Sequence, residues 1–136
     1  MTSEPFLSTI GQLALPAADL ARAVAFYRDV LGVPFLFEAP PGLAFFDCAG
    51  IRLMLAAGEV APKPHGDMVI YFRVADIDEA HRRLASDGVV FIDLPHLIAR
   101  MPDHELWICF FRDTEGNMLA LMEERRGRAG GRSVGT

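Results

Sequence analysis

Gln12 is the polar exception in an apolar segment that runs from Ile10 to Leu15. A carboxamide left without a hydrogen-bond partner in a protein interior costs about 1–3 kcal/mol. The side chain is therefore predicted either to bond to neighbouring backbone as a buried amide, or to give an orienting hydrogen bond to a ligand. The residue type and its surroundings leave both interpretations open.

The histidines offer a second set of candidates. Two of the four, His96 and His104, fall in a connecting segment that also holds Arg100 and Asp103, whereas His65 is expected in an exposed linker and His81 at the edge of a helix. Connecting segments laid over a rigid scaffold often carry function. His104 is therefore a candidate for lining a site, against the alternative of an exposed structural histidine. A metal site built from His96, His104 and Glu105 is a further alternative.

The two cysteines, Cys48 and Cys109, give no sign of redox or nucleophilic chemistry. They form no CxxC motif, and no histidine stands at a spacing that ties it to either thiol. A reactive thiol needs a lowered pKa, which an apolar environment does not supply. Both are predicted to be small core residues of a protein in a reduced compartment.

Composition bounds the class of protein. The chain has 136 residues, 51% of them hydrophobic, and a net charge of -5 from 18 acidic residues against 13 Lys and Arg. An acidic chain without a basic patch argues against nucleic-acid and acidic-membrane partners. No apolar run reaches the roughly 18 residues of a membrane span, and the first residues lack the basic and apolar regions of a signal peptide. The prediction is a cytoplasmic globular protein.

The polar candidates must be positioned by a strand and a helix that come early in the chain. The segment from Ile10 to Leu15 reads as a buried strand that Pro16 ends. Asp19 is a plausible N-cap, and apolar residues follow at helical spacing up to Leu31. Gly32 stands where a helix ends in a left-handed residue. Three short strands are then predicted, at 34–38, 43–48 and 51–56.

The same order of elements returns in the second half of the chain. Asp19 aligns with Asp76, 57 positions later, and the same offset aligns Gln12 with Val69. At the final hairpin the offset has grown to 66, so that Met54 aligns with Ala120. The extra residues must lie between about residues 91 and 107.

The repeat predicts an α+β fold made of two tandem βαβββ modules. The expected parts are a lead-in (1–8), a first module (9–58), a linker (59–67), a second module (68–124) with an insertion near 92–105, and a tail (125–136) that its composition predicts to be disordered.

These motifs resemble the vicinal oxygen chelate superfamily, which includes glyoxalase I, the bleomycin-resistance proteins and the extradiol dioxygenases. The resemblance covers residues 9–124 and rests on one set of positions in each module: Asp19, Phe26, Tyr27, Asp29, Leu31 and Gly32, and then Asp76, Gly88, Asp113, Gly116, Asn117 and Glu123. It implies a curled mixed sheet around a shared cavity, and in many members a homodimer.

The resemblance also implies where a metal would bind. In metal-dependent members the ligands come from the third residue of the strand before each helix and from the last strand of each module. Those positions here are Gln12, Met54, Val69 and Ala120. Divalent ions need several oxygen or imidazole donors, and of these four only the Gln12 carbonyl is one. The chain is therefore predicted to have lost the usual metal site and to carry no cofactor.

Strand alternation predicts which side chains share the cavity wall. The positions above place Ile10, Ala14, Arg52, Tyr71, Arg73, Met118 and Met122 on the same side, together with Leu106, Ile108 and Phe110; Trp107 and Cys109 then face a helix or a dimer partner. The predicted ligand-binding set is Gln12, Arg52, Met54, Val69, Tyr71, His104, Phe110 and Ala120. Such a wall suits a small, partly apolar ligand, unless these side chains simply fill the interior.

Two functions follow from these observations. The first is a metal-free binding protein, similar to the bleomycin-resistance proteins, that holds a small molecule between the modules. The alternative is an enzyme of the lyase, isomerase or dioxygenase type, which would use acid–base groups such as His104 or Tyr71, or non-standard metal ligands. The expected partners are a small molecule and a second copy of the chain.

Overall fold

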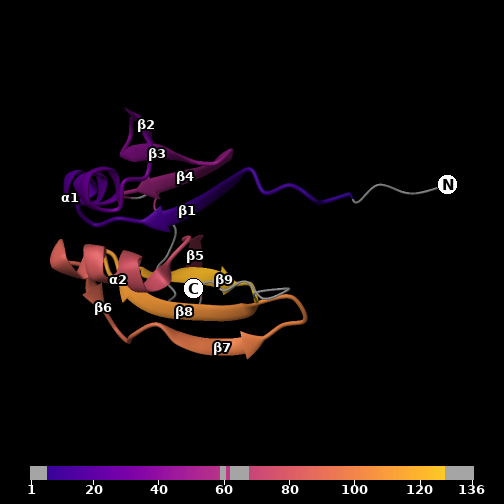
Figure 1. Cartoon of the computed structure of the whole chain (residues 1–136). Coiled ribbons are helices and arrows are strands. Elements are labelled where there is room, and N and C mark those ends of the chain that lie inside the picture. The colour runs from indigo at the N-terminus through magenta and orange to yellow at the C-terminus, as the bar shows by residue number, and fades with distance from the viewer. Residues whose placement is uncertain (1–5, 59–60, 62–67, 128–136) are drawn as a thin grey trace. The chain divides into compact units, whose positions relative to one another are not determined.

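The structure is a computed structural model that describes residues 6–58, 61 and 68–127. The chain divides into two compact units, residues 1–64 and 65–136, and each is described by itself below. Both units have the mixed α+β composition that the repeat predicts (Figure 1). The predicted linker at 59–67, apart from residue 61, and the tail from residue 128 lie outside the described residues.

The first module forms one four-stranded mixed sheet. Its strands have the order β1-β4-β3-β2, with β1 parallel to β4 and the other pairs antiparallel. A short helical segment follows β1, and Figure 1 views it nearly along its axis. The elements are β1 (Gln12–Pro16), α1 (Leu20–Ala25), the π-helix η1 (Phe26–Val30), β2 (Phe35–Ala39), β3 (Leu43–Cys48) and β4 (Ile51–Ala56).

The predicted helix boundaries of the first module are confirmed. The Asp19 carboxylate accepts a hydrogen bond from the Arg22 amide at 3.0 Å, as an N-cap does. Gly32 has φ +74°, a conformation that glycine adopts without strain. The last turn differs from a regular α-helix, because the Leu31 amide reaches back five residues to the Phe26 carbonyl. Sequence periodicity does not distinguish this π-turn from an α-helical one.

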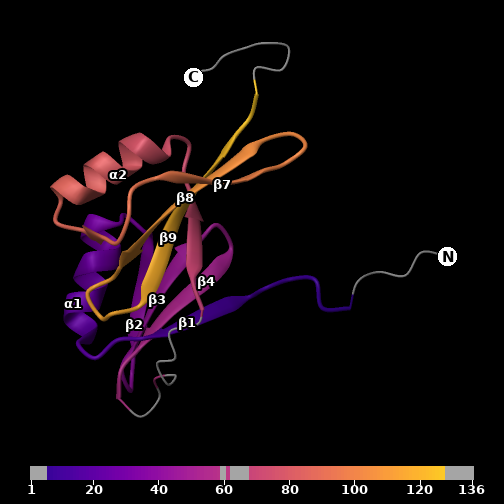
Figure 2. The same ribbon diagram turned by 90° about the horizontal axis from the view of Figure 1, so that it is seen from below.

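The second module repeats the order of the first and adds one strand. Its path is β5-β9-β8-β6, with β5 parallel to β9. The added strand, β7, pairs with β8, and it lies along the edge of the sheet in Figures 1 and 2. The elements are β5 (Ile70–Arg73), α2 (Ile77–Ser86), β6 (Val90–Phe91), β7 (His96–Arg100), β8 (Glu105–Arg112) and β9 (Met118–Arg125).

The strand β7 falls inside the predicted insertion, which was expected to be a connection without a strand of its own. The Asp93 carboxylate before it accepts a hydrogen bond from the Phe110 amide at 2.7 Å, which ties this segment to β8. Other boundaries shift slightly: β1 begins at Gln12 and β5 at Ile70, so Val69 precedes its strand, and β9 continues to Arg125. Helix α2 begins and ends as predicted, with Asp76 accepting from the Glu79 amide and Gly88 at φ +94°.

Each sheet has one face that packs on the helix of its own module. In the first sheet this face carries Phe46, Leu53 and Leu55, each no more than 1% exposed. In the second sheet it carries Phe111, Leu119 and Leu121, and none exceeds 3%. Burying one such side chain contributes about 1.5–3 kcal/mol, so these two faces supply much of the stability of each module.

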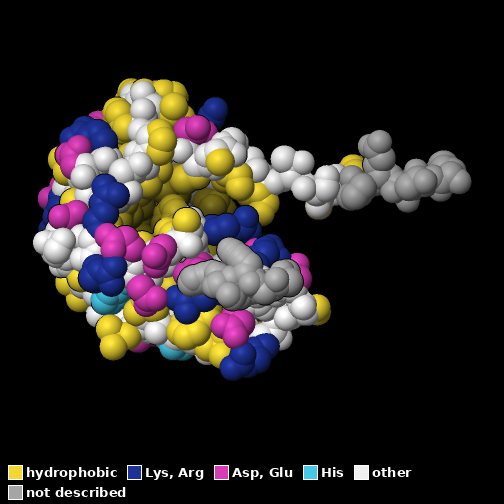
Figure 3. All heavy atoms as spheres, in the orientation of Figure 1, with side chains coloured by type: hydrophobic (Ala, Val, Ile, Leu, Met, Phe, Trp, Pro, Cys, Tyr) yellow, Lys and Arg dark blue, Asp and Glu magenta, His cyan; other side chains and the backbone are white. Residues whose placement is uncertain are grey.

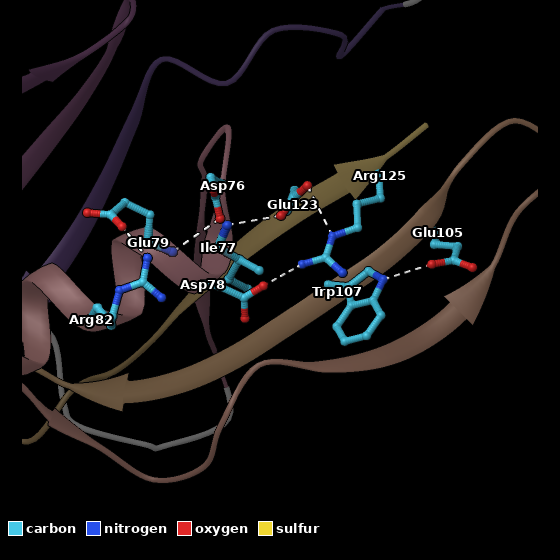
Figure 4. A network of polar contacts seen from close by, with 9 residues as sticks. All are labelled: Asp76, Ile77, Asp78, Glu79, Arg82, Glu105, Trp107, Glu123 and Arg125. Carbon is cyan, nitrogen blue, oxygen red and sulfur yellow. Dashed lines mark hydrogen bonds and ion pairs between the residues drawn. The ribbon is translucent and has the colours of Figure 1, made fainter. Parts of the chain in front are cut away.

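The second module holds its helix with a polar network that Figure 4 shows from close by. The Glu123 carboxylate accepts a hydrogen bond from the Ile77 amide at 2.9 Å, so a residue of β9 satisfies the first turn of α2. Arg125 pairs with Asp78 at 2.8 Å and stacks on the Trp107 ring, with its Cζ 4.2 Å from the ring centre. Trp107 therefore lies on the α2 face, as strand alternation predicts.

The exposed side of α2 is densely charged. Figure 3 shows basic and acidic side chains intermixed over the part of the second module that carries this helix. An ion pair between Arg82 and Glu79 is one example, on neighbouring turns. Exposed pairs of this kind contribute little to stability, so the charge chiefly keeps this surface in water.

Candidate ligand-binding site

The first sheet has a helix-free face, defined here as Gln12, Ala14, Phe37, Phe45, Arg52 and Met54. Strand register brings these residues together: Gln12 lies opposite Arg52 on β4, and Ala14 lies opposite Met54. On the other side of β4, Met54 lies opposite Phe45 of β3. Since side chains alternate between the faces of a sheet, all of them project away from α1.

Gln12 is exposed, so the interpretation of it as a buried amide is wrong. Its Nε2 donates a long contact of 3.8 Å to the Met54 sulfur. A thioether is a weak acceptor, so this contact leaves most of the hydrogen-bonding capacity of the amide unused. The strand is apolar around Gln12 because its alternate residues pack on α1, whereas Gln12 itself faces the other way.

Aromatic rings and a guanidinium complete this face. Arg52 lies over the Phe45 ring, with its Cζ 5.7 Å from the ring centre, and the Phe37 and Phe45 rings are 5.0 Å apart. Phe37 is 49% exposed, which is unusual for so large an apolar side chain. The face thus combines apolar surface with two polar groups that have few partners.

Phe37 and Phe45 lie on this face but were not among the residues predicted from the sequence. The signal for Phe45 was present in the predicted hairpin, because a two-residue turn at Ala49 and Gly50 fixes the register of β3 on β4. That register places Phe45 opposite Met54. Phe37 was not placed in the same way, because the strand predicted at 34–38 ends one residue before Ala39. The pairing of Ala39 with Leu43 sets the register that places Phe37 opposite Phe45.

The helix-free face of the second sheet is defined as Tyr71, Ile108, Phe110, Met118, Ala120 and Met122. Tyr71 and Phe110 both lie opposite Ala120, one from each side, and their ring centres are 6.2 Å apart. Tyr71 is 45% exposed. Arg73 follows on the same side of β5 and pairs with Glu124 at 3.6 Å. Four of the predicted site residues thus fall on or beside this face: Val69, Tyr71, Phe110 and Ala120.

His104 is not part of that cluster. It precedes β8 and lies six residues from Phe110, which at the rise of a strand is about 20 Å. Its Nδ1 lies 2.7 Å from the Asp103 carboxylate, and its side chain is only 13% exposed. Hydrogen bonds from His104 and from Arg126 lower the pKa of Asp103 below its usual range. These three residues form a separate polar group at the end of the sheet.

The alternative metal site of His96, His104 and Glu105 is not assembled. His96 lies opposite Ile108, and its Nδ1 is 2.8 Å from the Leu94 carbonyl. The Glu105 carboxylate is engaged by Arg100 at 2.6 Å and by the Trp107 indole at 3.0 Å. Within residues 6–58, 61 and 68–127, no group of three or more His, Cys, Asp or Glu side chains is arranged to hold an ion.

The positions that the resemblance assigns to a metal do not fit an ion either. Within the first sheet Gln12 already points its amide nitrogen at Met54. Within the second sheet the corresponding positions, Val69 and Ala120, carry no donor atom in their side chains. A thioether is a soft ligand, and one carboxamide oxygen is a weak one. This donor set is the wrong chemistry for the divalent ions that the scaffold commonly holds.

The cysteines are unsuited to nucleophilic chemistry. Burial raises the pKa of the Cys109 thiol to about 12, with Asp93 and Asp78 adding to the shift. Burial also raises the pKa of Cys48, and Asp47 contributes. Since the thiolate is the reactive form, both groups stay protonated and inert near neutral pH. Cys109 lies opposite Leu121, on the α2 face.

Comparison with known proteins defines the class. The sequence model of the Glyoxalase/Bleomycin resistance protein/Dioxygenase superfamily matches residues 9–121, which is most of the chain. The chain belongs to this superfamily, as its motifs predicted. Among curated proteins, the uncharacterized protein YraH of Bacillus subtilis (strain 168) is 25% identical over 126 residues, 81% of this chain and 94% of that protein.

Solved structures agree on the fold. A lactoylglutathione lyase from Agrobacterium tumefaciens is 28% identical with a TM-score of 0.69, over 88% of this chain and 96% of that one. A superfamily member from Sphaerobacter thermophilus DSM 20745 is 24% identical with a TM-score of 0.72, over 88% and 100%. TnmS3, an antibiotic binding protein from Streptomyces sp. CB03234, is 23% identical with a TM-score of 0.68, over 89% and 99%.

Proposed function

We propose that this protein binds a small, partly apolar organic molecule on the helix-free faces of its sheets, without a metal ion. The observation that carries the proposal is the make-up of these faces. They expose aromatic and thioether groups together with a few polar ones, of which Gln12, Arg52 and Tyr71 are the clearest. Apolar surface with a few convergent polar groups is the usual composition of a small-molecule site.

Two further points support a binder over a metalloenzyme. The donor set at the four family positions suits no divalent ion, whereas it leaves Gln12 and Met54 free to contact an organic ligand. A protein of the same fold, TnmS3, is an antibiotic binding protein. The proposed ligand-binding residues are Gln12, Arg52, Met54, Val69, Tyr71 and Phe110. Ala120 is fully buried, opposite Tyr71 on one side and Phe110 on the other, and His104 belongs to the alternative below.

A thermal-shift screen of small metabolites and antibiotics tests the proposal, because a ligand of the native state raises the apparent stability. A hit should bind Gln12→Ala more weakly, by about fivefold to tenfold if one hydrogen bond is lost. Ser86→Ala, on the exposed side of α2, is the matched control and should bind normally. Equal affinity in Gln12→Ala and the wild type would remove Gln12 from the site.

Metal analysis separates the proposal from a metal-dependent activity. Protein purified without chelators should contain no stoichiometric nickel, zinc, manganese or iron. The same ions should not raise the melting temperature when added back. A tightly held ion at one equivalent would overturn the proposal.

One observation favours an enzyme as the second candidate. His104 and Asp103 form a hydrogen-bonded pair, and a carboxylate that orients an imidazole is a common arrangement for acid–base work. Under this alternative, His104→Gln should abolish turnover of a bound compound while its affinity is kept. Under the binding function, no turnover exists to lose, and His104→Gln should leave the affinity unchanged.

We also propose that the protein is a homodimer in the cytoplasm, as the family resemblance and the composition lead us to expect. Among the described residues no helix is long and apolar enough to cross a membrane. Light scattering on the purified full chain gives the oligomeric state directly, and a mass of one chain at micromolar concentration would contradict the dimer. Neither nucleic acid nor membrane is an expected partner.

A further inference from the structure

Arg52 differs from most arginines of the described chain in having no acidic partner. Ion pairs join Arg28 to Asp29, Arg73 to Glu124, Arg82 to Glu79, Arg100 to Glu105 and Arg125 to Asp78. Within the residues that the structure describes, no carboxylate lies within ion-pair distance of Arg52. Its cross-strand neighbour Asp47 instead accepts a hydrogen bond from the Gly50 amide at 3.0 Å, inside the β3–β4 turn.

The surroundings of Arg52 hold its guanidinium in place while leaving its donors available. Its Cζ lies over the Phe45 ring, 5.7 Å from the ring centre, and this cation–π contact engages no hydrogen-bond acceptor. Gln12 lies directly opposite on β1, and its amide contacts only the weakly accepting Met54 sulfur. Five guanidinium donors and one amide group therefore stand side by side on the same face of a sheet.

This arrangement suits an anionic group attached to an apolar body. A planar guanidinium binds a carboxylate or phosphate with two parallel hydrogen bonds, and a neighbouring amide can add a third. The apolar part of the ligand would then lie on Phe45, Phe37 and Met54, which extend from Arg52 across neighbouring strands. The second sheet has no equivalent, because Met118 takes the place of Arg52 and Val69 takes the place of Gln12.

We infer that Arg52 and Gln12 bind the anionic group of a small aromatic ligand, whose rings lie on Phe45 and Met54. This inference rests on the proposed function and specifies the chemical class of its ligand as an aromatic anion. It also separates the roles of the two modules. The first binds the anionic group, and the second offers aromatic and thioether surface from Tyr71, Phe110 and Met118.

Matched probes test the inference with the full chain. Naphthoate and naphthamide have the same ring system and differ in charge, while naphthyl phosphate and inorganic phosphate separate a carboxylate preference from a phosphate preference. Titrations followed by NMR of the methionine methyl groups and the arginine Nε–H groups report both affinity and place. We expect naphthoate to bind wild type at least about tenfold more tightly than naphthamide, with shifts at Arg52 and Met54.

Arg52→Gln should remove that preference, so that the two probes bind about equally, and Arg52→Lys should keep part of it as a point charge. Arg83→Gln is the matched control, since Arg83 also lacks a described ion pair but lies exposed on α2, away from both helix-free faces; it should keep the full preference. Added salt should weaken naphthoate and leave naphthamide unchanged.

The outcomes separate this inference from the proposed function. If both probes bind wild type equally, or if Arg52→Gln keeps the preference, the anionic class is wrong and a neutral ligand remains for the same face. Shifts confined to other residues would also overturn it. If no naphthyl probe binds and the wider screen finds no ligand of any kind, the proposed function fails together with the inference.

Discussion

The two modules have the same helix-facing side and different helix-free faces. Phe46 lies opposite Leu53 in the first module as Phe111 lies opposite Leu119 in the second. On the other face the pairs are Phe45 with Met54 and Phe110 with Ala120. The aromatic position is kept there, whereas the polar neighbours Gln12 and Arg52 have only apolar counterparts.

The difference shows which side of a repeated sheet is constrained by folding. The side under the helix must exclude water in both modules, so both copies need large apolar residues at the same places. The helix-free face has no such shared requirement within a module. Its side chains are free to differ, and the proposed function depends on this divergence.

The helix docking also differs between the modules. In the second module the Glu123 carboxylate accepts a hydrogen bond from the Ile77 amide. The equivalent residue in the first module is Ala57, whose side chain has no acceptor. The two backbones are otherwise alike there: the Ala17 amide donates to the Ala56 carbonyl, and the Val74 amide donates to the Met122 carbonyl. The network of Glu123, Arg125 and Asp78 is thus an addition to the shared frame.

The largest loss of stability should come from truncating the buried aromatic side chain that each sheet packs against its helix, Phe46 in the first module and Phe111 in the second. Phe46→Ala and Phe111→Ala should each lower the free energy of unfolding by about 3–5 kcal/mol, because both side chains are fully buried. Denaturant unfolding measures the loss. Phe37→Ala, at a half-exposed position, should cost clearly less. A loss below about 1 kcal/mol in either core variant would contradict the equivalence of the two modules.

The two cysteines are also expected to differ strongly in their reactivity toward an alkylating reagent. Cys109 has a pKa of about 12 and is fully buried, whereas Cys48 is only partly buried. Iodoacetamide at mildly alkaline pH should label Cys48 first and leave Cys109 unmodified until the protein unfolds. Mass spectrometry of the labelled peptides distinguishes the sites, and Cys48→Ser isolates the signal of Cys109. Rapid labelling of Cys109 in the native protein would contradict this prediction, because it would show that the reagent reaches the side of the sheet that packs on α2.

A moderate effect is expected at the added helix contact. Glu123→Ala should cost about 1–3 kcal/mol, since it leaves the Ile77 amide without its acceptor at the start of α2. Hydrogen exchange at that amide should accelerate in the variant. Glu124→Gln is the neighbouring control, and its more exposed pairs should contribute less than about 1 kcal/mol. Equal losses in both variants would make the Glu123 contact an ordinary surface pair.

The smallest effect on stability is expected from Asp103, in the turn before β8. Because the pKa of Asp103 is lowered on folding, its contribution is present above the ordinary value near 3.8 and is lost as the pH falls through the lower folded value. Arg126→Gln should move the pKa of Asp103 part of the way back, and His104→Gln should move it further. Carbon-detected NMR titration of the carboxyl group measures both. An unchanged pKa in both variants would contradict these contacts.

Much of the fold could be predicted from the sequence because its signals are local. Asp19 and Asp76 cap helices with their own side chains, and Gly32 and Gly88 end them with their own backbone angles. The strand β7 escaped prediction because it exists only by pairing with β8. The π-turn of η1 escaped because a single widened turn, closed by the hydrogen bond from the Leu31 amide to the Phe26 carbonyl, is too short to change the apolar spacing visibly.

The candidate site was predicted less completely, because its residues come from strands that are far apart in the sequence. Strand alternation correctly grouped Gln12 with Ala14, and Arg52 with Met54, because parity is a local property. Parity alone gives no position along a strand, so it grouped His104 with Phe110, although the six residues between them correspond to about 20 Å at the rise of a strand. Nor could it give the exposure of Gln12, which depends on what covers its face.

The sequence by itself determined the two-module frame, the family and the poor metal-ligand chemistry of Gln12, Met54, Val69 and Ala120, because repeats and donor atoms can be read from residue types alone. Only the tertiary structure decided that Gln12 is exposed and that Arg52 lies on Phe45 with no described carboxylate to pair with. Those features arise where β1, β3 and β4 meet in register, and a register between strands distant in sequence forms only when the sheet does.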